Sequence, residues 1–443
     1  MIRIPFSRNK RYLTGMDWLV HTFDYMTSQA TGVGNLSQIV LELSSSPAED
    51  EIRKYLTDFV EKYPVVNGWP KRDYNLAPYW KIHPRARKVP LSISVSRLGI
   101  DMNAVNVLPI LEQGVNMSFN SIREHLAFHL VCSEEKSFLA MTFDHRLFDA
   151  SGAEAFLAMF QQEWEERSDY SQDIVFSEPA HLCRWREKFE AGKRVNRTFL
   201  RLAENAPPRV FPLSSVPNDR GFRFKLIPFN EQQTATIIET AYNETGYLLL
   251  MPYILAVSIK VLHGIFTGRS IEGGDYIIPV TIDMRPLAKI REELFFNHMS
   301  FFLFQIKAEE ADSFPILLEA IKQQMYDQVK SGLPRDISQV AFLMRIVPLP
   351  ALSYLIRLYL KGQIASSCFA YLGETAYTFS RFMEEEVNNL FHMPRAPVPP
   401  GLGIFFNQFQ GKLNAVLSYI EGILSEDEIE EIANNLRIQL GSG

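Results

Sequence analysis

The chain has 443 residues, 47% of them hydrophobic and 22% charged, so it can bury large cores and is not a disordered polypeptide. This length exceeds one ordinary domain, and we expect two. The formal net charge is -6 and no stripe of Lys and Arg is present, which argues against a nucleic-acid partner.

The cysteines and the N-terminus indicate the compartment. Cys132, Cys183 and Cys368 lie far apart and lack metal-ligand spacing, a pattern typical of buried thiols in a reducing environment. The first residues also lack the apolar core of a signal peptide. The sequence therefore predicts a cytoplasmic protein.

The first half begins with a predicted strand and helix. Residues 38–43 alternate apolar and polar side chains, which predicts a strand. A helix follows, in which Ser46 can cap the first turn, Glu49 completes a capping box and Pro64 ends the apolar pattern.

A predicted hairpin comes next. Residues 125–131 alternate as a strand, and the polar turn at 133–136 joins them to a second apolar run. His125 and His129 are four residues apart, a spacing that can bind a metal on a helix. Because the alternation indicates a strand, we expect no metal site here.

The stretch from Ser137 to Phe160 is the centre of the sequence. It begins as an alternating apolar strand that ends at His145 and becomes a helix by Ala153. Ser151 and Glu154 have the spacing of a capping box, so we expect Ser151 to cap this helix. The tight connection between strand and helix is where open α/β sheets tend to place their chemistry.

The second half repeats the order of the first. A proline-rich polar segment at 204–220 predicts a linker. A strand at 222–227, helices at 230–245 and 248–266 and a strand at 276–282 then follow. Similar order and size in the two halves indicate two related lobes.

Several segments now form a recognisable set. His145-Arg146-Leu147-Phe148-Asp149 resembles the H-x-x-x-D core of the HHxxxDG motif. That motif belongs to the superfamily of chloramphenicol acetyltransferases, condensation domains of nonribosomal peptide synthetases, plant BAHD acyltransferases and wax-ester synthase-type enzymes. Residues 276–287, which include Arg285, resemble the P-V-x-x-R-P segment of that superfamily, and 411–436 resemble its closing strand and helix. Their order along the chain strengthens the resemblance.

The sequence departs from the family pattern at three positions. Asp144 stands where many members have a first histidine, Ala150 stands where glycine follows the aspartate, and Phe296 stands where glycine precedes Asn297. No D-F-G-W-G segment is present, which argues against the plant branch. A glycine at position 150 would supply dihedral freedom that alanine lacks.

The resemblance implies a fold and its division. We expect an α/β protein of two chloramphenicol-acetyltransferase-like lobes, each a mixed sheet with flanking helices, and an active-site tunnel between them. The expected boundaries are residues 1–203 for the lobe with the motif, 204–220 for the linker and 221–443 for the second lobe.

The resemblance also implies acyl transfer from a thioester to a hydroxyl or amine. A neutral imidazole is suited to deprotonate such an acceptor, and His145 is the expected general base. Asp149 either orients that imidazole, as in a triad, or pairs with Arg285 as a structural carboxylate, the role that the family favours. The attacked carbonyl needs a donor for its developing charge, and Asn297 and Ser300 lie in a segment that could supply one.

The expected donors and partners follow. There is no GxGxxG after a strand, no P-loop and no cysteine–histidine cluster, so we expect no metal or tightly bound cofactor. Acyl-CoA and an acyl-carrier-protein thioester both remain open as the donor, and the acceptor is a small molecule or a lipid.

Two further interpretations remain. Phe342 to Leu360 is strongly apolar but contains Arg345 and Arg357, so it is either a buried helical pair or a surface that contacts a lipid or a membrane. The departures at Asp144 and Ala150 leave open a catalytically degenerate module that binds or recruits a partner. A hydrolase using Ser151 is disfavoured because the G-x-S-x-G elbow is absent.

Overall fold

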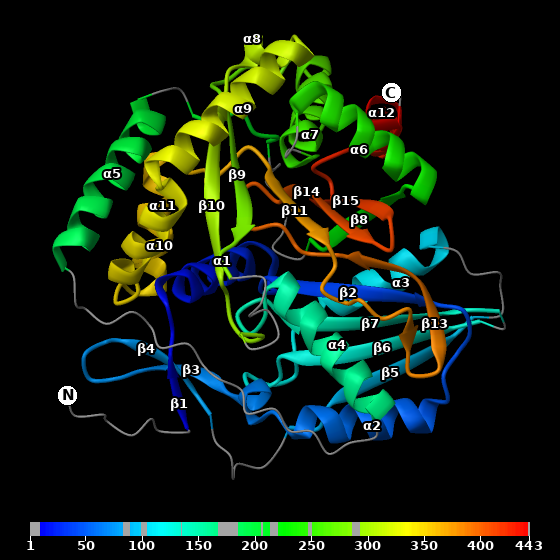
Figure 1. The fold of residues 1–443 in the computed structure, drawn as a ribbon. Helices are drawn as coiled ribbons and strands as arrows, with labels where there is room; N and C mark the ends of the chain where they lie inside the picture. The colour runs from blue at the N-terminus through cyan, green and yellow to red at the C-terminus, as the bar shows by residue number, and fades with distance from the viewer. Residues whose placement is uncertain are drawn as a thin grey trace.

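Two six-stranded sheets with flanking helices form two lobes, as expected (Figure 1). The mixed α/β architecture predicted from the sequence is confirmed. The structure is a computed structural model that describes residues 9–82, 89–98, 104–133, 135–166, 185–204, 207–212, 220–246, 250–285 and 293–441.

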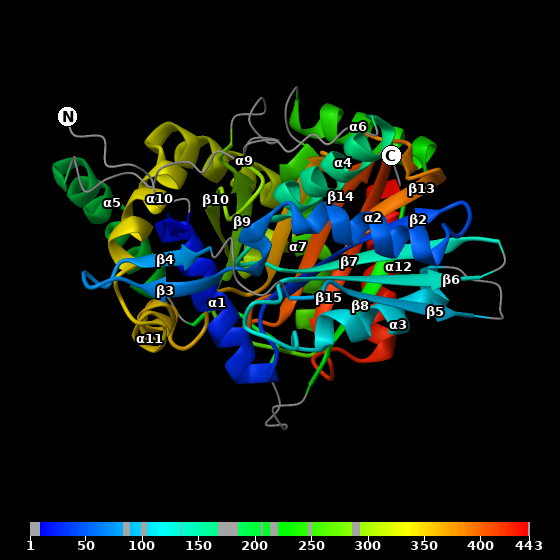
Figure 2. The ribbon, with the colours of Figure 1, turned by 90° about the horizontal axis from the view of Figure 1, so that it is seen from below.

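The sheet of the first lobe is built around strand β7, which is buried along its whole length and lies between β2 and β6 (Figure 2). The strand order is β12-β13-β2-β7-β6-β5, and β5 runs parallel to β6. The strands are β2 Leu36–Leu43, β5 Ser92–Arg97, β6 Leu126–Cys132, β7 Ser137–Asp144, β12 Arg381–Phe382 and β13 Glu385–His392. The hairpin predicted between β6 and β7 is therefore present.

Strands β12 and β13 come from the second half of the chain. β13 pairs antiparallel with β2, with Leu390 opposite Leu41. The side-chain amides of Asn389 in β13 and Asn414 in β15 form two hydrogen bonds with each other, at 2.9 and 3.0 Å, and so connect β13 to the second sheet. Residues 1–203 thus do not form the first sheet alone, because residues 381–392 complete it.

The described part of the first half of the chain also forms helices α1 to α5, of which α5 packs on α10 and α11, and a small sheet of order β1-β4-β3. A capping box between Thr14 and Asp17 starts α1. A Cβ at Gly15 would lie 2.0 Å from the carbonyl carbon of Ala341, so glycine allows α1 to approach α10. The elements are β1 Lys10–Tyr12, α1 Gly15–Thr31, α2 Glu49–Glu61, the 3-10 helix Pro64–Asn67, β3 Trp69–Arg72, β4 Pro78–Lys81, α3 Ala104–Asn116, α4 Ala150–Glu166 and α5 Trp185–Glu204.

The sheet of the second lobe has the order β10-β9-β11-β14-β15-β8. β11 runs parallel to both β9 and β14, and the other pairs are antiparallel. The strands are β8 Phe222–Pro228, β9 Tyr276–Asp283, β10 Met299–Ile306, β11 Cys368–Glu374, β14 Leu402–Phe409 and β15 Lys412–Ile420. The predicted strands at 222–227 and 276–282 are confirmed.

Helices of the second half cover this sheet and fill the junction with the first lobe. They are α6 Glu231–Thr245, α7 Leu250–Gly268, α8 Ala308–Ala311, α9 Phe314–Ser331, α10 Leu333–Met344, α11 Leu349–Tyr359 and α12 Glu426–Gly441. By length and composition α7 could cross a membrane, but 72% of its most apolar window is buried against its neighbours. It is packed as a core helix.

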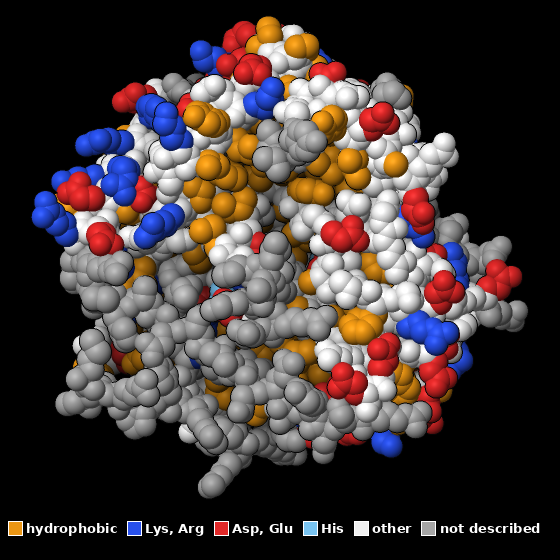
Figure 3. Space-filling model, viewed as in Figure 1, with side chains coloured by type: hydrophobic (Ala, Val, Ile, Leu, Met, Phe, Trp, Pro, Cys, Tyr) orange, Lys and Arg blue, Asp and Glu red, His pale blue; other side chains and the backbone are white. Residues whose placement is uncertain are grey.

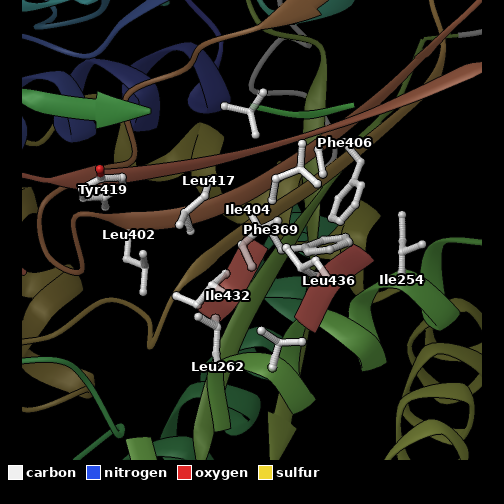
Figure 4. Close-up of a cluster of buried hydrophobic side chains, with 14 of the residues drawn as sticks. Ile254, Leu262, Phe369, Leu402, Ile404, Phe406, Leu417, Tyr419, Ile432 and Leu436 are labelled. Atoms are coloured by element: carbon white, nitrogen blue, oxygen red, sulfur yellow. The ribbon is translucent and has the colours of Figure 1, made fainter. Parts of the chain in front are cut away.

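The core of the second lobe lies between this sheet and helices α7 and α12. Figure 4 shows side chains of the two helices meeting those of the strands, with Leu436 of α12 near Phe369 and Leu262 of α7 beside Ile432 of α12. Each such large apolar side chain contributes about 1.5–3 kcal/mol when it leaves water. The apolar periodicity of 250–268 thus reflects this packing.

Strand β7 separates two cores. Leu139, Met141 and Phe143 belong to the aromatic core of the first lobe. Phe138 and Ala140 face the other way and join the core that extends into the second lobe. This two-sided burial explains why the strand is apolar at nearly every position, and it places the end of β7 at the junction of the lobes.

The edge strand β10 is covered by glutamine side chains. Gln328 of α9 accepts from the Leu303 N–H at 2.8 Å and donates to the Leu303 carbonyl at 2.9 Å. Gln324, one turn earlier, makes the same pair of bonds with Gln305 at 2.9 and 2.7 Å. The two amides take the place of a neighbouring strand and so protect an edge that could otherwise pair with another chain.

Several local expectations need correction. Helix α2 begins at Glu49 after Ala48, with no side-chain bond to the cap, so Ser46 does not cap it. Within the predicted linker, residues 205–206 and 213–219 lie outside the described residues. Phe211 is buried and stacks on Phe266 at 3.9 Å, so that part of the segment packs on the second lobe.

The apolar stretch from Phe342 to Leu360 forms the end of α10, a turn and α11. Leu352 is buried, whereas Tyr354 and Leu358 on the same helix are 62% and 56% exposed. The stretch is therefore buried on only one side. Cys132 and Cys368 are free thiols, and Cys183 lies outside the described residues.

Candidate active site

His145 directly follows β7, in the tight connection before α4. Its N–H donates to the Asn35 carbonyl at 3.3 Å, and its carbonyl accepts from Nδ2 of Asn297 at 3.0 Å. Asn35 follows α1 in the first lobe, while Asn297 precedes β10 in the second. Backbone bonds from both lobes therefore fix the position of this residue.

The imidazole of His145 is half-buried beside Phe143, at a ring distance of 6.4 Å. Nδ1 is enclosed and has no hydrogen-bond partner among the described residues. Because Nδ1 is enclosed, Nε2 is the ring nitrogen suited to exchange a proton with a bound molecule.

Asp149 caps helix α4 and connects the lobes. Its carboxylate accepts from the Gly152 N–H at 2.9 Å and from the His298 N–H at 3.0 Å, and both oxygens accept from Arg285. Burial alone would raise the pKa of Asp149, but the Arg285 charge and the hydrogen bonds from Arg285 and His298 together outweigh it and lower that pKa below its usual value. The structure thus brings together the predicted carboxylate and arginine.

The expected cap at Ser151 is wrong. Helix α4 begins at Ala150, and Asp149 supplies the capping oxygen two residues before the position expected. Ala150 lies in this helix and not in the left-handed region, so the backbone needs no glycine there. Glycine is needed at 152 instead, where a Cβ would lie 2.1 Å from the Leu294 carbonyl oxygen.

Arg285 is buried, and its guanidinium N–H groups donate hydrogen bonds to carboxylates and to a backbone carbonyl. Besides Asp149, its guanidinium donates to Asp283 at 2.6 Å and to the Glu293 carbonyl at 3.0 Å. These contacts hold the end of β9 against the start of α4. With so many bonds to the protein, Arg285 is positioned as a structural cation.

Asn297 and Phe296 form a strained turn beside His145. The Asn297 N–H donates to Asp17 of α1 at 3.0 Å, and its Oδ1 is buried without a partner among the described residues. Phe296 has φ of 74°, the left-handed conformation in which glycine is usual. Its ring packs under Arg11 at 3.7 Å and edge-on to Trp80, contacts that a glycine could not make.

Ser300, the other expected carbonyl donor, is fully buried on β10. Its hydroxyl donates to the Pro334 carbonyl at 2.6 Å, where α10 begins. This bond uses its single proton to hold α10 on the strand. The structure therefore gives Ser300 a packing role, and it does not place this hydroxyl with His145 and Asp149.

A second charged cluster lies on the other side of His145, and the sequence did not reveal it. Asp144 is fully buried and bonds Nδ1 of His125 at 2.8 Å and the Arg146 guanidinium at 2.6 Å. Nε2 of His125 bonds the Gly68 carbonyl at 2.8 Å, and Arg146 also lies 3.5 Å from Asp24. Burial would raise the pKa of Asp144, but Arg146 and then His125 hold it well below its usual range.

Asp144 therefore fills the position of the missing histidine with a fixed charge. The one signal in the sequence was the charged residue at the end of an apolar strand next to an arginine. His125 lies nineteen residues away and Asp24 much further, so their meeting depends on the fold. No group of His, Cys, Asp and Glu suited to a metal occurs among the described residues, and His129 instead bonds Ser96.

His21 of α1 lies against this cluster without a hydrogen bond to it. Its ring stacks on Trp18 at 5.4 Å, packs edge-on to Trp80 and has no partner for Nε2 among the described residues. Burial, aided by the Arg146 charge, lowers the pKa of His21 to about 3. His21 is thus a neutral core histidine.

Comparisons with known proteins support the fold. No family model matches the chain, and no curated protein matches it in sequence. It is similar in structure to trichothecene 15-O-acetyltransferase from Fusarium sporotrichioides, with TM-score 0.70 and 11% identity over 98% of this chain and 95% of that one.

Two synthetase domains are similar as well. The first condensation domain of the calcium-dependent antibiotic synthetase gives TM-score 0.70 at 12% identity, over 98% of this chain and 97% of that one. The cyclization-docking bidomain from Sorangium cellulosum gives 0.68 at 14%, over 98% and 85%. The chain thus has the two-lobed fold of condensation domains and chloramphenicol-acetyltransferase-like enzymes, as the resemblance predicted.

Proposed function

We propose that the protein is a thioester-dependent acyltransferase in which His145 is the general base. The observation that carries this proposal is the placement of His145, whose backbone is held by Asn35 from one lobe and Asn297 from the other. A half-buried imidazole at such a junction can meet a donor and an acceptor that enter from different sides. The fold shared with an acetyltransferase agrees with this reaction.

In the proposed reaction, Nε2 of His145 takes the proton of the acceptor hydroxyl or amine as that atom attacks the thioester carbonyl. The tetrahedral intermediate then collapses, the C–S bond breaks, and the thiolate receives the proton from the imidazolium. The products are the ester or amide and the free thiol, and His145 is neutral again. A base of this kind contributes about 10²–10⁴ in rate.

We assign Asp149 and Arg285 a positioning role and not a triad role. Both carboxylate oxygens of Asp149 are already occupied by Arg285 and by the N–H groups of Gly152 and His298. An Asp149 oxygen aimed at His145 would have to give up one of these bonds. The pair instead fixes the connection that carries the base.

The substrates are assigned by class. We propose acyl-CoA or an acyl-carrier-protein thioester as the donor, and the likeness to domains of peptide synthetases makes a carrier protein a plausible partner. We propose a small-molecule or lipid acceptor that enters a passage beside His145. Ser300 is not part of this proposal, because its hydroxyl is bonded to Pro334.

The test measures free thiol released from a panel of acyl-CoA and acyl-carrier-protein thioesters. We expect acceptor-dependent release by the native chain, a fall of about 10²–10⁴ for His145→Ala and no comparable fall for the control His129→Ala. His129 is a half-buried histidine of the same sheet that bonds Ser96. No release from any donor, with ligand binding unchanged in His145→Ala, would favour a catalytically degenerate binding module.

A further inference from the structure

One end of the molecule presents exposed apolar side chains. Figures 1 and 2 both place the tip of the β3–β4 hairpin, α5, α10 and α11 at this end. Six of the eighteen large hydrophobic residues that are exposed in the described part of the chain lie on the hairpin tip, the α10–α11 turn and α11. We call these six the docking face: Tyr74, Leu76, Ile346, Tyr354, Leu355 and Leu358, between 41% and 93% exposed.

The hairpin tip and the helical turn are bound into one surface. The Arg72 guanidinium donates to the Leu76 carbonyl at 2.7 Å, to the Ile346 carbonyl at 2.8 Å and to the Val347 carbonyl at 2.9 Å. Leu76 has φ of 61°, a position where glycine or asparagine is usual, so turn geometry does not account for a leucine there.

The segments that carry the docking face hold more exposed cations than anions. No Asp or Glu occurs between Asp336 and Glu374, while Arg357 and Lys361 are exposed on or beside α11. In the hairpin, the carboxylate of Asp73 is used by the Asn75 and Ala77 N–H groups and by the Tyr12 hydroxyl. In a chain of net charge -6, this end is locally basic.

Helix α5 extends the basic character. Figure 3 shows Lys and Arg side chains over α5 together with some Asp and Glu side chains. The helix has six Lys and Arg residues against three Glu residues, and Arg197 and Arg201 are exposed there. The helix is joined to α11 by the Tyr359 hydroxyl, which donates to Asn196 at 3.0 Å, and by the Phe199 and Tyr359 rings at 5.6 Å. The apolar ridge therefore has cations on its flank.

We propose that the docking face binds the surface of a bilayer that contains anionic lipid. A projecting hairpin tip and a helix ridge can enter a fluid interface, which adapts to their shape. Tyrosine favours the headgroup level, and exposed Lys and Arg are attracted to negative lipid at about 1 kcal/mol each. The surplus of cations thus selects an anionic membrane as the occupant.

The docking face also lies one helix away from the candidate site. The Trp18 Nε1–H of α1 donates to the Val347 carbonyl at 2.9 Å, and Asp17 of the same helix accepts from Asn297. A bilayer at this face would therefore lie next to the helix that supports His145. Membrane binding stands without the catalytic role, and its test needs no substrate.

The experiment is co-sedimentation of the full chain with vesicles. One set contains phosphatidylcholine alone and the other phosphatidylcholine with phosphatidylserine. We expect binding to the anionic vesicles, at least about tenfold weaker binding for Leu355→Ser combined with Leu358→Ser, and about fivefold weaker binding for each of Arg357→Gln and Lys361→Gln. Leu76→Asn, which suits the backbone at that position, should weaken binding without loss of thermal stability.

Ile438→Ser is the matched control, because Ile438 is a 61% exposed residue of α12, away from the docking face. It should bind like the native chain. Equal binding by all variants, equal binding to both vesicle sets or no binding at all would overturn the proposal. A different outcome would show that a second copy of the chain covers this face. In that case the chain would not bind vesicles, and sedimentation velocity would show self-association that Leu355→Ser combined with Leu358→Ser abolishes.

Discussion

The two carboxylates on either side of His145 are held in different ways. Asp144 bonds His125 and Arg146, both from the first lobe. Asp149 bonds Arg285 and the His298 N–H, both from the second lobe. The first cluster therefore secures the end of β7 within its own sheet, and the second secures the relation between the lobes. The six-residue segment from Asp144 to Asp149 thus combines an anchor within the first lobe with an anchor to the second lobe.

The largest effect on stability is expected at Asp149, the anchor to the second lobe. Asp149→Ala leaves the buried Arg285 without its main partner and removes the cap of α4, so we expect a loss of about 3–5 kcal/mol in the free energy of unfolding. Four of the five tryptophans lie in the first 164 residues, so tryptophan fluorescence reports mainly on the first lobe, while circular dichroism reports on the whole chain.

Urea unfolding followed by both signals would measure this loss. We expect the two transitions to separate in Asp149→Ala, because the contact between the lobes is weakened. The control is Asp283→Asn, which changes a carboxylate 34% exposed on the other side of Arg285 and should cost about 1 kcal/mol. Coincident, unshifted transitions in Asp149→Ala would show that the pair does not connect the lobes.

A change at Asp144, the anchor within the first lobe, should lower the free energy of unfolding by less and should leave the contact between the lobes intact. Asp144→Asn keeps the shape of the side chain but removes the charge between His125 and Arg146, while Asp24 still compensates Arg146 at 3.5 Å. We expect a loss of about 2–3 kcal/mol. In the same urea experiment the fluorescence and circular dichroism transitions should both move to lower urea concentration. They should stay together, unlike the separated transitions expected for Asp149→Ala.

The pH dependence of stability would sharpen the comparison. His21 is neutral in the folded protein because burial lowers its pKa from 6.5 to about 3, but the unfolded chain takes up a proton as the pH falls below 6.5. The free energy of unfolding should fall by about 1.4 kcal/mol per pH unit between those limits. His21→Phe keeps a ring between Trp18 and Trp80 and should flatten this slope, measured by urea unfolding from about pH 7 to about pH 5. An unchanged slope would mean that His21 does not set it.

The smallest effect is expected at Ser151. Because Asp149 is the cap of α4, Ser151→Ala should change the free energy of unfolding by less than about 0.5 kcal/mol. Thermal or urea unfolding would detect a larger value. If Ser151→Ala lowered the free energy of unfolding by about 1 kcal/mol, the usual contribution of an N-cap, Ser151 would be the cap of α4.

The sequence predicted the strand and the helix that carry the site more accurately than the side-chain contacts within it. The strand before His145, the helix after it and Arg285 follow from local apolar patterns and short motifs. Ser151 and Asp149 both satisfy the rules for a helix cap, and the structure decides between them, because α4 begins at Ala150 and the Gly152 N–H donates to Asp149.

Long-range pairings were beyond reach for a physical reason. No strand was predicted at β13, and a local pattern carries no information on which sheet a strand joins, so the pairing of β13 with β2 was not expected. The cluster around Asp144 likewise includes His125, which directly precedes β6, and Asp24 of α1, which pairs with Arg146, and these residues meet only when the first lobe is folded. Phe296 was visible as an unusual residue, and its φ of 74° explains why glycine is common there.

The most direct test of the central claim combines rate and stability for His145→Ala. This change should lower the rate of thiol release by about 10²–10⁴ and alter the free energy of unfolding by less than about 1 kcal/mol, because the imidazole is half-buried and its Nδ1 has no partner among the described residues. A rate like that of the native chain, or a large loss of stability that accounts for lost activity, would contradict the assignment of His145 as the base.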